Sequence, residues 1–519
     1  MSTTSQRRSR RTRRLLALGA ATLLAAGLAA CSSGKSVDLG DAGDSGDTSQ
    51  GITVAIAGEP DQLDPHKTTS YFSFEVLENV YDTLVEPDEN LQMQPSLAES
   101  WDVSKDQLTW TFHLRQGVMF QDGTPMTAKD VVYSFDRIID DKLATAYRFS
   151  AVKDIKALDD DTVEIDVTAP SPNLLSSIGG FKGVAIVEKK NVTSGDITTH
   201  PVGTGPYELT DFTSGDHIDL EANPDYWGGA PSIPSIRYRF ISEGSTAVAA
   251  LKAGEIQWTD SIPPQQVKAL QGDDSVDIDV VPSNDYWYLA LNEKRKPFDD
   301  VRVRQAIAYA IDRDAIAQVT SYGTAKVNEL AIPEESAWYT AYDTYSKDDD
   351  KAEQLLDEAG VKNLTMELMV SSDYPETVKA AQVIADELAD VGITLKIRSL
   401  DFGTWLDEQN KGNFDMLYMG WLGNIDPDDY YYSQHHTGGS SNAQGYSNAE
   451  VDTLLDEGRT TTDETERKEI YAKAATQIAD DASYIYLYNP SVIQAYSPDL
   501  SGYTVRSDRA IRWVDASMG

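Results

Sequence analysis

The chain is poor in cysteine and in positive charge. Its 519 residues include one cysteine, Cys31, and 84 aspartates and glutamates outnumber 44 lysines and arginines, which gives a formal net charge of −40 at pH 7. A single cysteine cannot form an intramolecular disulfide or a cysteine zinc site, so a hydrophobic core must stabilise the fold. A surface this acidic repels phosphate backbones, which argues against nucleic acid as a partner.

Signatures of the common enzyme classes are missing as well. The sequence contains no Gly-x-Ser-x-Gly nucleophile motif, no His-Glu-x-x-His metal motif and no glycine-rich phosphate loop. We therefore predict that the chain is not an enzyme and that it has no cofactor. Its 84 carboxylates would permit a pair of glycosidase acids, so a surface hydrolase stays open as an alternative of a different class.

Positive charge gathers at the N-terminus. Residues 1–30 contain six arginines and no acid, and they end in an apolar run of 16 residues, 15–30. That run is shorter than the roughly 20 residues of a membrane-spanning helix, and the pattern is typical of an export signal. The sequence Leu28-Ala29-Ala30-Cys31 resembles a bacterial lipobox. It predicts removal of residues 1–30, a diacylglycerol on the Cys31 thiol and acylation of the new amino terminus. The export route, general or twin-arginine, stays open.

A polar segment follows the predicted cleavage site. Of the 19 residues from 32 to 50, five are serine, four are glycine and four are aspartate, a composition typical of flexible, solvated chain. We predict that residues 31–50 tether a folded body to the membrane. Without residues 1–30 the charge becomes 38 − 84 = −46, because six of the 44 basic residues are removed.

The remainder alternates between strand and helix patterns. Alternating apolar residues predict strands at 52–56 and 108–114. Thr127 is typical of a helix N-cap, and Asp299 or Asp300 is expected to cap a later helix. The chain is long enough for about two to four structural lobes of an α/β protein.

The clearest α/β unit spans residues 364–421. Its pattern predicts, in order, a strand at 364–370, a helix at 378–391, a strand at 393–397, a short helix around Trp405 and a strand at 414–419. Open α/β sheets bind ligands beyond the carboxyl ends of their strands. Trp421, Asn424 and Asp426 follow the last strand, so we expect them to contact a ligand.

Several ordered motifs resemble one family. They are Leu97-Ala98-Glu99-Ser100-Trp101, Thr109 to Val118, Phe120 to Pro125, Thr127 to Val131, Gly203-Thr204-Gly205-Pro206-Tyr207, Asn223 to Trp227 and Pro297 to Ala306. Together they resemble the family 5 solute-binding proteins, the peptide- and nickel-binding components of ABC importers. The resemblance covers nearly everything from Gly51 to the end.

The resemblance implies an α/β, two-lobed periplasmic-binding-protein (type II) fold with an extra N-terminal lobe. By analogy, residues 51–80, 199–293 and 490–519 form lobe I, residues 81–198 the extra lobe II, and residues 294–489 lobe III. The implied function is capture of a peptide-like solute by lobe closure and delivery to the permease subunits of an ABC transporter. We expect a monomer, lipid-anchored on the extracytoplasmic face of the cell membrane.

The resemblance also indicates where a ligand binds. Trp421 is expected to form an apolar platform, Asn424 and Asp426 polar anchors, and Tyr71 a contact from the opposite lobe. In peptide binders an aspartate pairs with the peptide ammonium at the position that Asn424 occupies here, so free dipeptides are disfavoured. Asp426 or Asp428 could replace that charge if the loop is shifted.

Longer, capped or modified peptides and other amide-rich solutes remain open as ligands. His435 and His436 resemble the metal-chelate branch of the family, which makes a nickel-chelate binder the alternative. Adjacent histidines usually point apart, so we predict no metal site there.

Overall fold

The computed structural model describes residues 51–180, 182–421 and 425–519. These residues all belong to one compact unit. The predicted export signal, the tether with Cys31, and Asn424 lie outside the described residues. None of the described helices combines the length and the apolarity that a membrane crossing requires.

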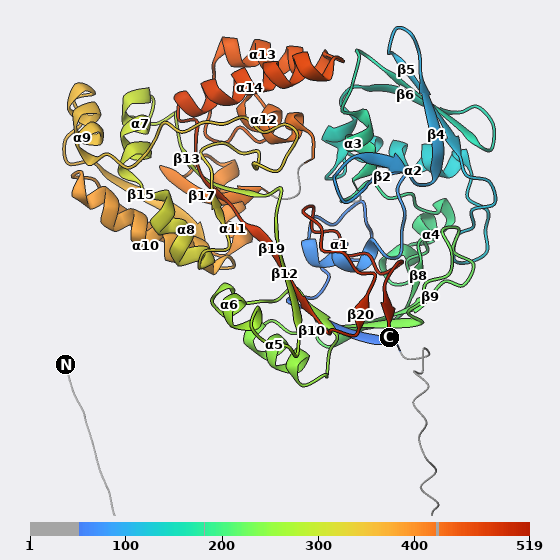
Figure 1. Ribbon diagram of the computed structural model, residues 1–519. Helices are drawn as coiled ribbons and strands as arrows, with labels where there is room; N and C mark the ends of the chain where they lie inside the picture. The colour runs from blue at the N-terminus through green and yellow to red at the C-terminus, as the bar shows by residue number, and fades with distance from the viewer. Residues whose placement is uncertain (1–50, 181, 422–424) are drawn as a thin grey trace, which may run out of the picture. The chain divides into compact units, whose positions relative to one another are not determined.

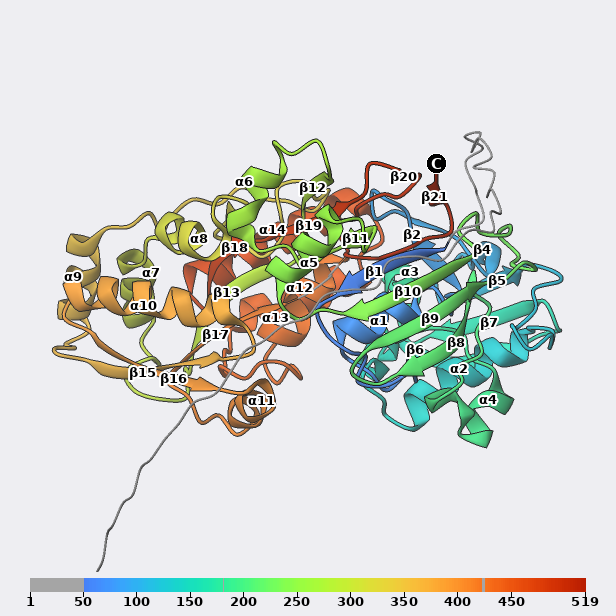
Figure 2. The ribbon, with the colours of Figure 1, turned by 90° about the horizontal axis from the view of Figure 1, so that it is seen from below.

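A seven-stranded sheet contains β1, the first strand of the described chain (Figures 1 and 2). Its strands lie in the order β12 (Asp277–Pro282), β19 (Ser491–Tyr496), β11 (Trp258–Thr259), β1 (Ile52–Ile56), β10 (Ser235–Phe240), β9 (His217–Ala222) and β8 (Tyr207–Thr213). β1 has the predicted bounds and runs parallel to β10 and β11. The connections between these strands contain α1 (Tyr71–Leu77), α5 (Gly244–Lys252), η3 (Pro264–Gln266) and α6 (Val267–Leu270).

A six-stranded sheet contains the predicted α/β unit (Figure 1). Its order is β14 (Lys326–Val327), β18 (Tyr484–Asn489), β13 (Tyr286–Leu291), β17 (Met416–Trp421), β15 (Thr365–Ser371) and β16 (Thr394–Leu400). β15 runs parallel to both β16 and β17, so the prediction of a parallel unit is confirmed. Every residue of β13 and β18 is buried, as expected for strands covered on both faces.

Eight helices accompany this sheet among the described residues. They are α7 (Val301–Ala310), α8 (Arg313–Ser321), α9 (Asp349–Glu358), α10 (Pro375–Asp390), α11 (Phe402–Asn410), α12 (Pro427–His435), α13 (Ala449–Thr460) and α14 (Glu464–Asp480). Asp300 caps α7, because its carboxylate accepts a hydrogen bond from the backbone N–H of Arg302. α10 and α11 confirm the helices predicted at 378–391 and around Trp405.

A four-stranded sheet forms between residues 98 and 167. Its order is β4 (Ala98–Val103), β5 (Thr109–Leu114), β7 (Thr162–Val167) and β6 (Val152–Ala157). The surrounding segment contains α2 (Ala128–Asp140), η1 (Ala146–Phe149), α3 (Leu174–Gly179), α4 (Lys189–Ser194) and η2 (Asp196–Thr198). Two small ribbons, β2 (Val85–Pro87) with β3 (Met93–Pro95) and β20 (Leu500–Ser501) with β21 (Ser517–Met518), complete the strands.

Two short connections join the seven-stranded sheet to the six-stranded sheet. One runs from β12 to β13 through residues 283–285, and the other runs from β18 to β19 through Pro490. They contact each other, since both the backbone N–H and the hydroxyl of Ser283 donate to the carbonyl of Pro490, at 3.1 and 2.8 Å. The exact lobe boundaries given above stay a prediction.

Candidate ligand-binding site

A cavity of about 240 Å³ lies beyond the carboxyl end of β17. One wall comes from η1 and α3, and the other comes from β17, α12 and α13. The lining side chains that carry charge, an amide or an indole ring are Arg148, Asn173, Trp421, Asp428, Asp429, Gln434 and Arg459. The cavity therefore offers an apolar surface together with charges of both signs.

Trp421 is the last residue of β17 and lines this cavity. Its backbone pairs with Tyr286 of β13, and β17 also lies beside β15 at its other edge, so the sheet holds the residue in place. The residue is half-buried. This position agrees with the predicted role as a platform, and contact with a ligand stays a prediction.

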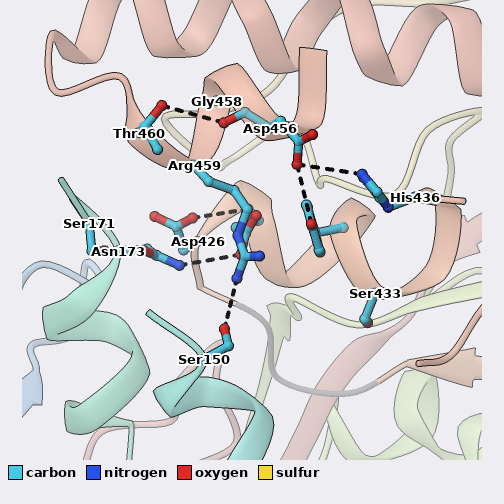
Figure 3. Close-up of polar contacts among 12 residues, drawn as sticks. Ser150, Ser171, Asn173, Asp426, Ser433, His436, Asp456, Gly458, Arg459 and Thr460 are labelled. Carbon is cyan, nitrogen blue, oxygen red and sulfur yellow. Dashed lines mark hydrogen bonds and ion pairs between the residues drawn. The ribbon is translucent and has the colours of Figure 1, made fainter. Parts of the chain in front are cut away.

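A hydrogen-bonded network around Asp428 joins the two walls, and Figure 3 shows its members Arg459, Ser150 and Asn173. The Asp428 carboxylate forms an ion pair with Arg459 at 3.2 Å and accepts hydrogen bonds from Tyr471 at 3.0 Å and Asn173 at 3.3 Å. Arg459 extends from α13 to donate to the Ser150 hydroxyl at 3.1 Å. Burial raises the pKa of Asp428 to about 6, although Arg459 opposes the shift.

Arg459 is further oriented by an aromatic ring. Its guanidinium lies 3.8 Å from the ring centre of Tyr432, which also lines the cavity. Such stacking stabilises a cation over the ring face and fixes the plane of the guanidinium. Tyr432 in turn donates its hydroxyl to Asp456 at 3.2 Å.

Asp429 and Arg148 contribute the other two charges. Burial raises the pKa of Asp429 to about 7, and the nearby Arg148 guanidinium opposes that rise. Arg148 donates to the carbonyl of Gly180 at 3.3 Å. Both side chains also line an adjoining space of about 30 Å³, together with Ser176 and Lys182.

The family of bacterial extracellular solute-binding proteins, family 5 Middle, matches residues 92–443. The chain belongs to this family. Glutathione-binding protein GsiB of Pectobacterium atrosepticum is 31% identical over 485 residues, which are 91% of this chain and 94% of that protein.

Solved structures of binding proteins have a similar fold. The periplasmic binding protein DppA of Helicobacter pylori, in complex with the peptide STSA, has a TM-score of 0.80 at 27% identity over 90% of this chain and 98% of that one. NikZ of Campylobacter jejuni, in complex with Ni(L-His), has a TM-score of 0.79 at 25% identity over 90% and 99%. The fold is thus the predicted two-lobed α/β fold of family 5 binding proteins, and the chain is an extracytoplasmic solute-binding protein rather than an enzyme.

Asp426 of this family 5 protein does not line the cavities described above. Its carboxylate receives two hydrogen bonds from the Arg467 guanidinium, at 2.6 and 2.8 Å, and one from the backbone N–H of Asp428 at 2.9 Å. The residue caps α12 and is buried. Its carboxylate is therefore occupied within the protein, and the predicted role as a ligand anchor finds no support in this geometry and stays a prediction.

Tyr71 begins α1, and its hydroxyl donates to the carbonyl of Arg509 at 3.1 Å. The Arg509 guanidinium lies 5.6 Å from the centre of its ring and forms an ion pair with Asp285 at 2.6 Å. Since Asp285 lies in one of the two connections between the sheets, Tyr71 belongs to the surroundings of that connection. Its predicted contact with a ligand is not tested by these contacts.

The two adjacent histidines lie in different surroundings. His435 is fully buried, with its ring nitrogens 3.0 Å from the hydroxyls of Ser483 and Tyr486, and burial lowers its pKa to about 3. His436 lies 3.4 Å from Asp456. In the described ranges, the group that has the spacing of metal ligands is Asp211, His217 and Asp219, on β8 and β9.

No sequence motif surrounds Arg148, so the sequence does not predict a role for it in the site. It lies in a short 3-10 helix far from the Trp421 loop in the chain, and only folding brings the two together. Asp429 had a usable signal, since it directly follows Asp426-Pro427-Asp428 at the predicted strand end.

Proposed function

We propose that this protein captures a peptide-like solute by closure of its lobes and delivers it to the permease of an ABC importer. The observation that carries the proposal is the cavity at the end of β17, where Trp421 adjoins charges of both signs. The chain's membership of family 5, the peptide named with DppA and the tripeptide glutathione in the name of GsiB support a ligand of this class.

The cavity lining suits the chemistry of a short peptide. Asn173, Ser150, Ser433 and Gln434 supply neutral donors and acceptors that match peptide amide groups. Trp421 supplies apolar surface for a side chain. Arg148 and Asp429 can balance the charged groups of a zwitterion. The lining therefore matches the backbone amides, a side chain and the charged groups of a short peptide.

The paired connections support closure as the mode of capture. Residues 283–285 and Pro490 link the two larger sheets side by side, and hinges in closing proteins are a few such residues between rigid elements. We infer that the lobes move about these connections when a ligand enters.

Binding can be tested by isothermal titration of the exported chain with di-, tri- and longer peptides, glutathione and nickel-histidine chelates. We expect a peptide-like ligand to bind, and Trp421→Ala to weaken it by about tenfold or more through loss of buried aromatic surface. Phe402→Ala, a partly exposed aromatic residue of α11, serves as the control. Binding of the nickel chelate alone would favour the alternative ligand class, and peptide hydrolysis abolished by a carboxylate change would overturn the proposal.

We further propose that Cys31 anchors the protein to the membrane. Two or more acyl chains hold a protein firmly, whereas one holds it weakly. Mass spectrometry of the N-terminal peptide from cells should show a lipidated Cys31, and Cys31→Ser should move the protein from the membrane fraction to the soluble exported fraction. An unmodified thiol in wild-type protein would contradict the anchor. Light scattering should show a monomer.

A further inference from the structure

Three acids at the start of α12, at positions 426, 428 and 429, have different partners. Asp426 pairs with Arg467, and Asp428 pairs with Arg459. Asp429 interacts with the backbone N–H of Asp426 but forms no ion pair with any cation of the described chain. It is therefore the acid of this turn that has no cation partner among the described residues.

Arg148 is the corresponding cation on the opposite wall. It donates to the Gly180 carbonyl at 3.3 Å and lies near the Tyr147 hydroxyl, and no described carboxylate forms an ion pair with it. The charges of Arg148 and Asp429 act on each other, yet the two side chains do not join in an ion pair within the described part of the molecule. A cation and an anion that share a recess without pairing leave room for a group between them.

The size of the recess limits that group. Arg148 and Asp429 line both the space of about 30 Å³ and the cavity of about 240 Å³. The smaller space has room for little more than a water-sized group, so a ligand group that contacts both residues lies mainly in the larger cavity. The rest of the same ligand can extend past Arg148 and Asp429 toward Trp421.

Lys182 and Arg512 also line the smaller space, and Arg512 pairs with Glu86. Lys182 adds a second cation without an ion pair among the described residues. Its ammonium donates to the backbone carbonyl of Asp508 at 3.0 Å. Of the acids that share this space with Asp429, Asp508 pairs with Arg506, whereas Glu78 accepts from the backbone N–H of Ile511 and has no ion pair among the described residues. The surroundings of Arg148 thus have cationic capacity for a carboxylate and, at Asp429 with Glu78 nearby, anionic capacity for an ammonium.

We propose that Arg148 and Asp429 bind one α-amino-acid group of the ligand, with its carboxylate on Arg148 and its ammonium on Asp429. Arg148 offers a planar pair of N–H donors that matches a carboxylate, and Asp429 offers the charge that a buried ammonium requires. The ligand class is a peptide-like solute that keeps both charges on one carbon, as a γ-linked glutamyl peptide does. This inference rests on the proposed function and specifies its ligand.

An ordinary peptide does not present such a group. Its ammonium and carboxylate lie at opposite ends, and each residue of an extended chain adds about 3.3–3.6 Å, so the charges of a tripeptide lie roughly 10 Å apart. A γ-glutamyl linkage uses the side-chain carboxyl for the amide and leaves the α-ammonium and α-carboxylate together. Arg148 and Asp429 therefore select for the linkage of the ligand rather than for its composition.

Two isomers test the selection directly. γ-Glu-Ala-Gly and α-Glu-Ala-Gly have the same composition and the same net charge, and neither contains a thiol that could oxidise. Titration of the exported chain should give a dissociation constant at least about tenfold lower for the γ-isomer. An N-acetylated γ-isomer, which lacks the ammonium, should lose that advantage.

Variants connect the preference to the two residues. Arg148→Gln and Asp429→Asn should each reduce the γ-to-α affinity ratio toward one, whereas Arg148→Lys should keep part of it because the charge remains. Arg237→Gln and Asp102→Asn are matched controls, since both side chains are largely exposed on other strands, β10 and β4. Far-UV circular dichroism and unfolding midpoints would verify that each variant folds.

The outcomes separate this inference from the proposed function. Equal binding of the two isomers, or tighter binding of the α-isomer, overturns the inference and leaves peptide capture standing. A preference for the γ-isomer that survives in both Arg148→Gln and Asp429→Asn also overturns the assignment to these residues. Failure of every peptide to bind, with the protein folded, overturns the proposed function and the inference with it.

Discussion

Asp426, Asp428 and Asp429 lie within four positions of the chain, yet their carboxylates lie in three environments. The first is held by the guanidinium of Arg467, the second by Arg459 and Tyr471, and the third faces a recess. The partners come from α13 and α14, which follow in the chain and pack against α12. At the scale of single residues, whether an acid is paired within the protein therefore depends on which helix packs against it.

Removing the carboxylate of Asp426 should destabilise the protein. Asp426→Ala leaves the buried Arg467 without its partner and removes the cap of α12, so we expect the free energy of unfolding to fall by about 3–5 kcal/mol. Urea unfolding measures the loss, and the exposed Asp102→Ala is the control. Unchanged stability together with lost ligand affinity would instead support the ligand-anchor role predicted from sequence.

His435 should make stability depend on pH. Its pKa falls from 6.5 in the unfolded chain to about 3 in the fold, so below pH 6.5 the unfolded state binds a proton that the folded state does not. The free energy of unfolding should therefore fall as pH decreases from 6.5 toward 3, by up to about 1.4 kcal/mol per pH unit.

His435→Gln should remove this contribution. The difference in unfolding free energy between wild type and variant should shrink by about 1.4 kcal/mol for each pH unit between about pH 6 and pH 4. Denaturant unfolding in matched buffers provides the measurement, and His113→Gln, at an exposed histidine, serves as the control. A difference that does not change with pH would show that His435 is protonated in the folded state.

At the scale of elements, close approach of backbones determines where the chain can cross itself. Residues 203–205, which precede β8, pass directly against Val80. A Cβ atom on Gly203 would lie 2.0 Å from the Val80 carbonyl oxygen, and one on Gly205 would lie 2.6 Å from its carbonyl carbon. The Gly-Thr-Gly motif of the sequence therefore has a steric role in the fold.

Replacing two glycines by alanine should change the free energy of unfolding in opposite directions. Gly203→Ala should lower the free energy of unfolding by about 1–3 kcal/mol, because the backbone of Val80 cannot move aside without disturbing its neighbours. Gly403→Ala should raise it by up to about 1 kcal/mol, since that exposed position in α11 has room for a Cβ. Equal effects at the two sites would contradict the steric argument.

At the scale of the whole molecule, excess negative charge opposes compaction. The full chain carries −40, and the chain without residues 1–30 carries −46, so like charges repel one another across the folded surface. The described ion pairs offset only part of this repulsion because many of them are exposed and therefore weak. Ligand recognition depends instead on a few charges in a shielded recess.

Salt should stabilise the exported chain. Raising the ionic strength from about 0.01 M to about 0.15 M shortens the screening length from about 30 Å to about 8 Å, which weakens the repulsion among surface acids. We expect the midpoint of thermal unfolding to rise with sodium chloride over this range. A falling midpoint would mean that attractive ion pairs outweigh the net charge.

The sequence predicted much of the fold because its signals are local. β1, β5, α2, α7 and the unit from β15 to β17 all lie within a few residues of their predicted positions. Apolar periodicity and capping residues act over one or two turns, so they can be read without knowing the partners. The ordered motifs likewise identified the family.

By itself, then, the sequence determined the α/β class, the family and the place of Trp421 at a strand end. Only the tertiary structure decided which charges are free in the recess and which are already paired. Arg467 forms an ion pair with Asp426, while Arg148, from a segment far away in the chain, lines the same recess as Asp429 without pairing with it among the described residues. Such pairing depends on which helices pack together, and in one sequence no local pattern records the distance between two side chains from different elements.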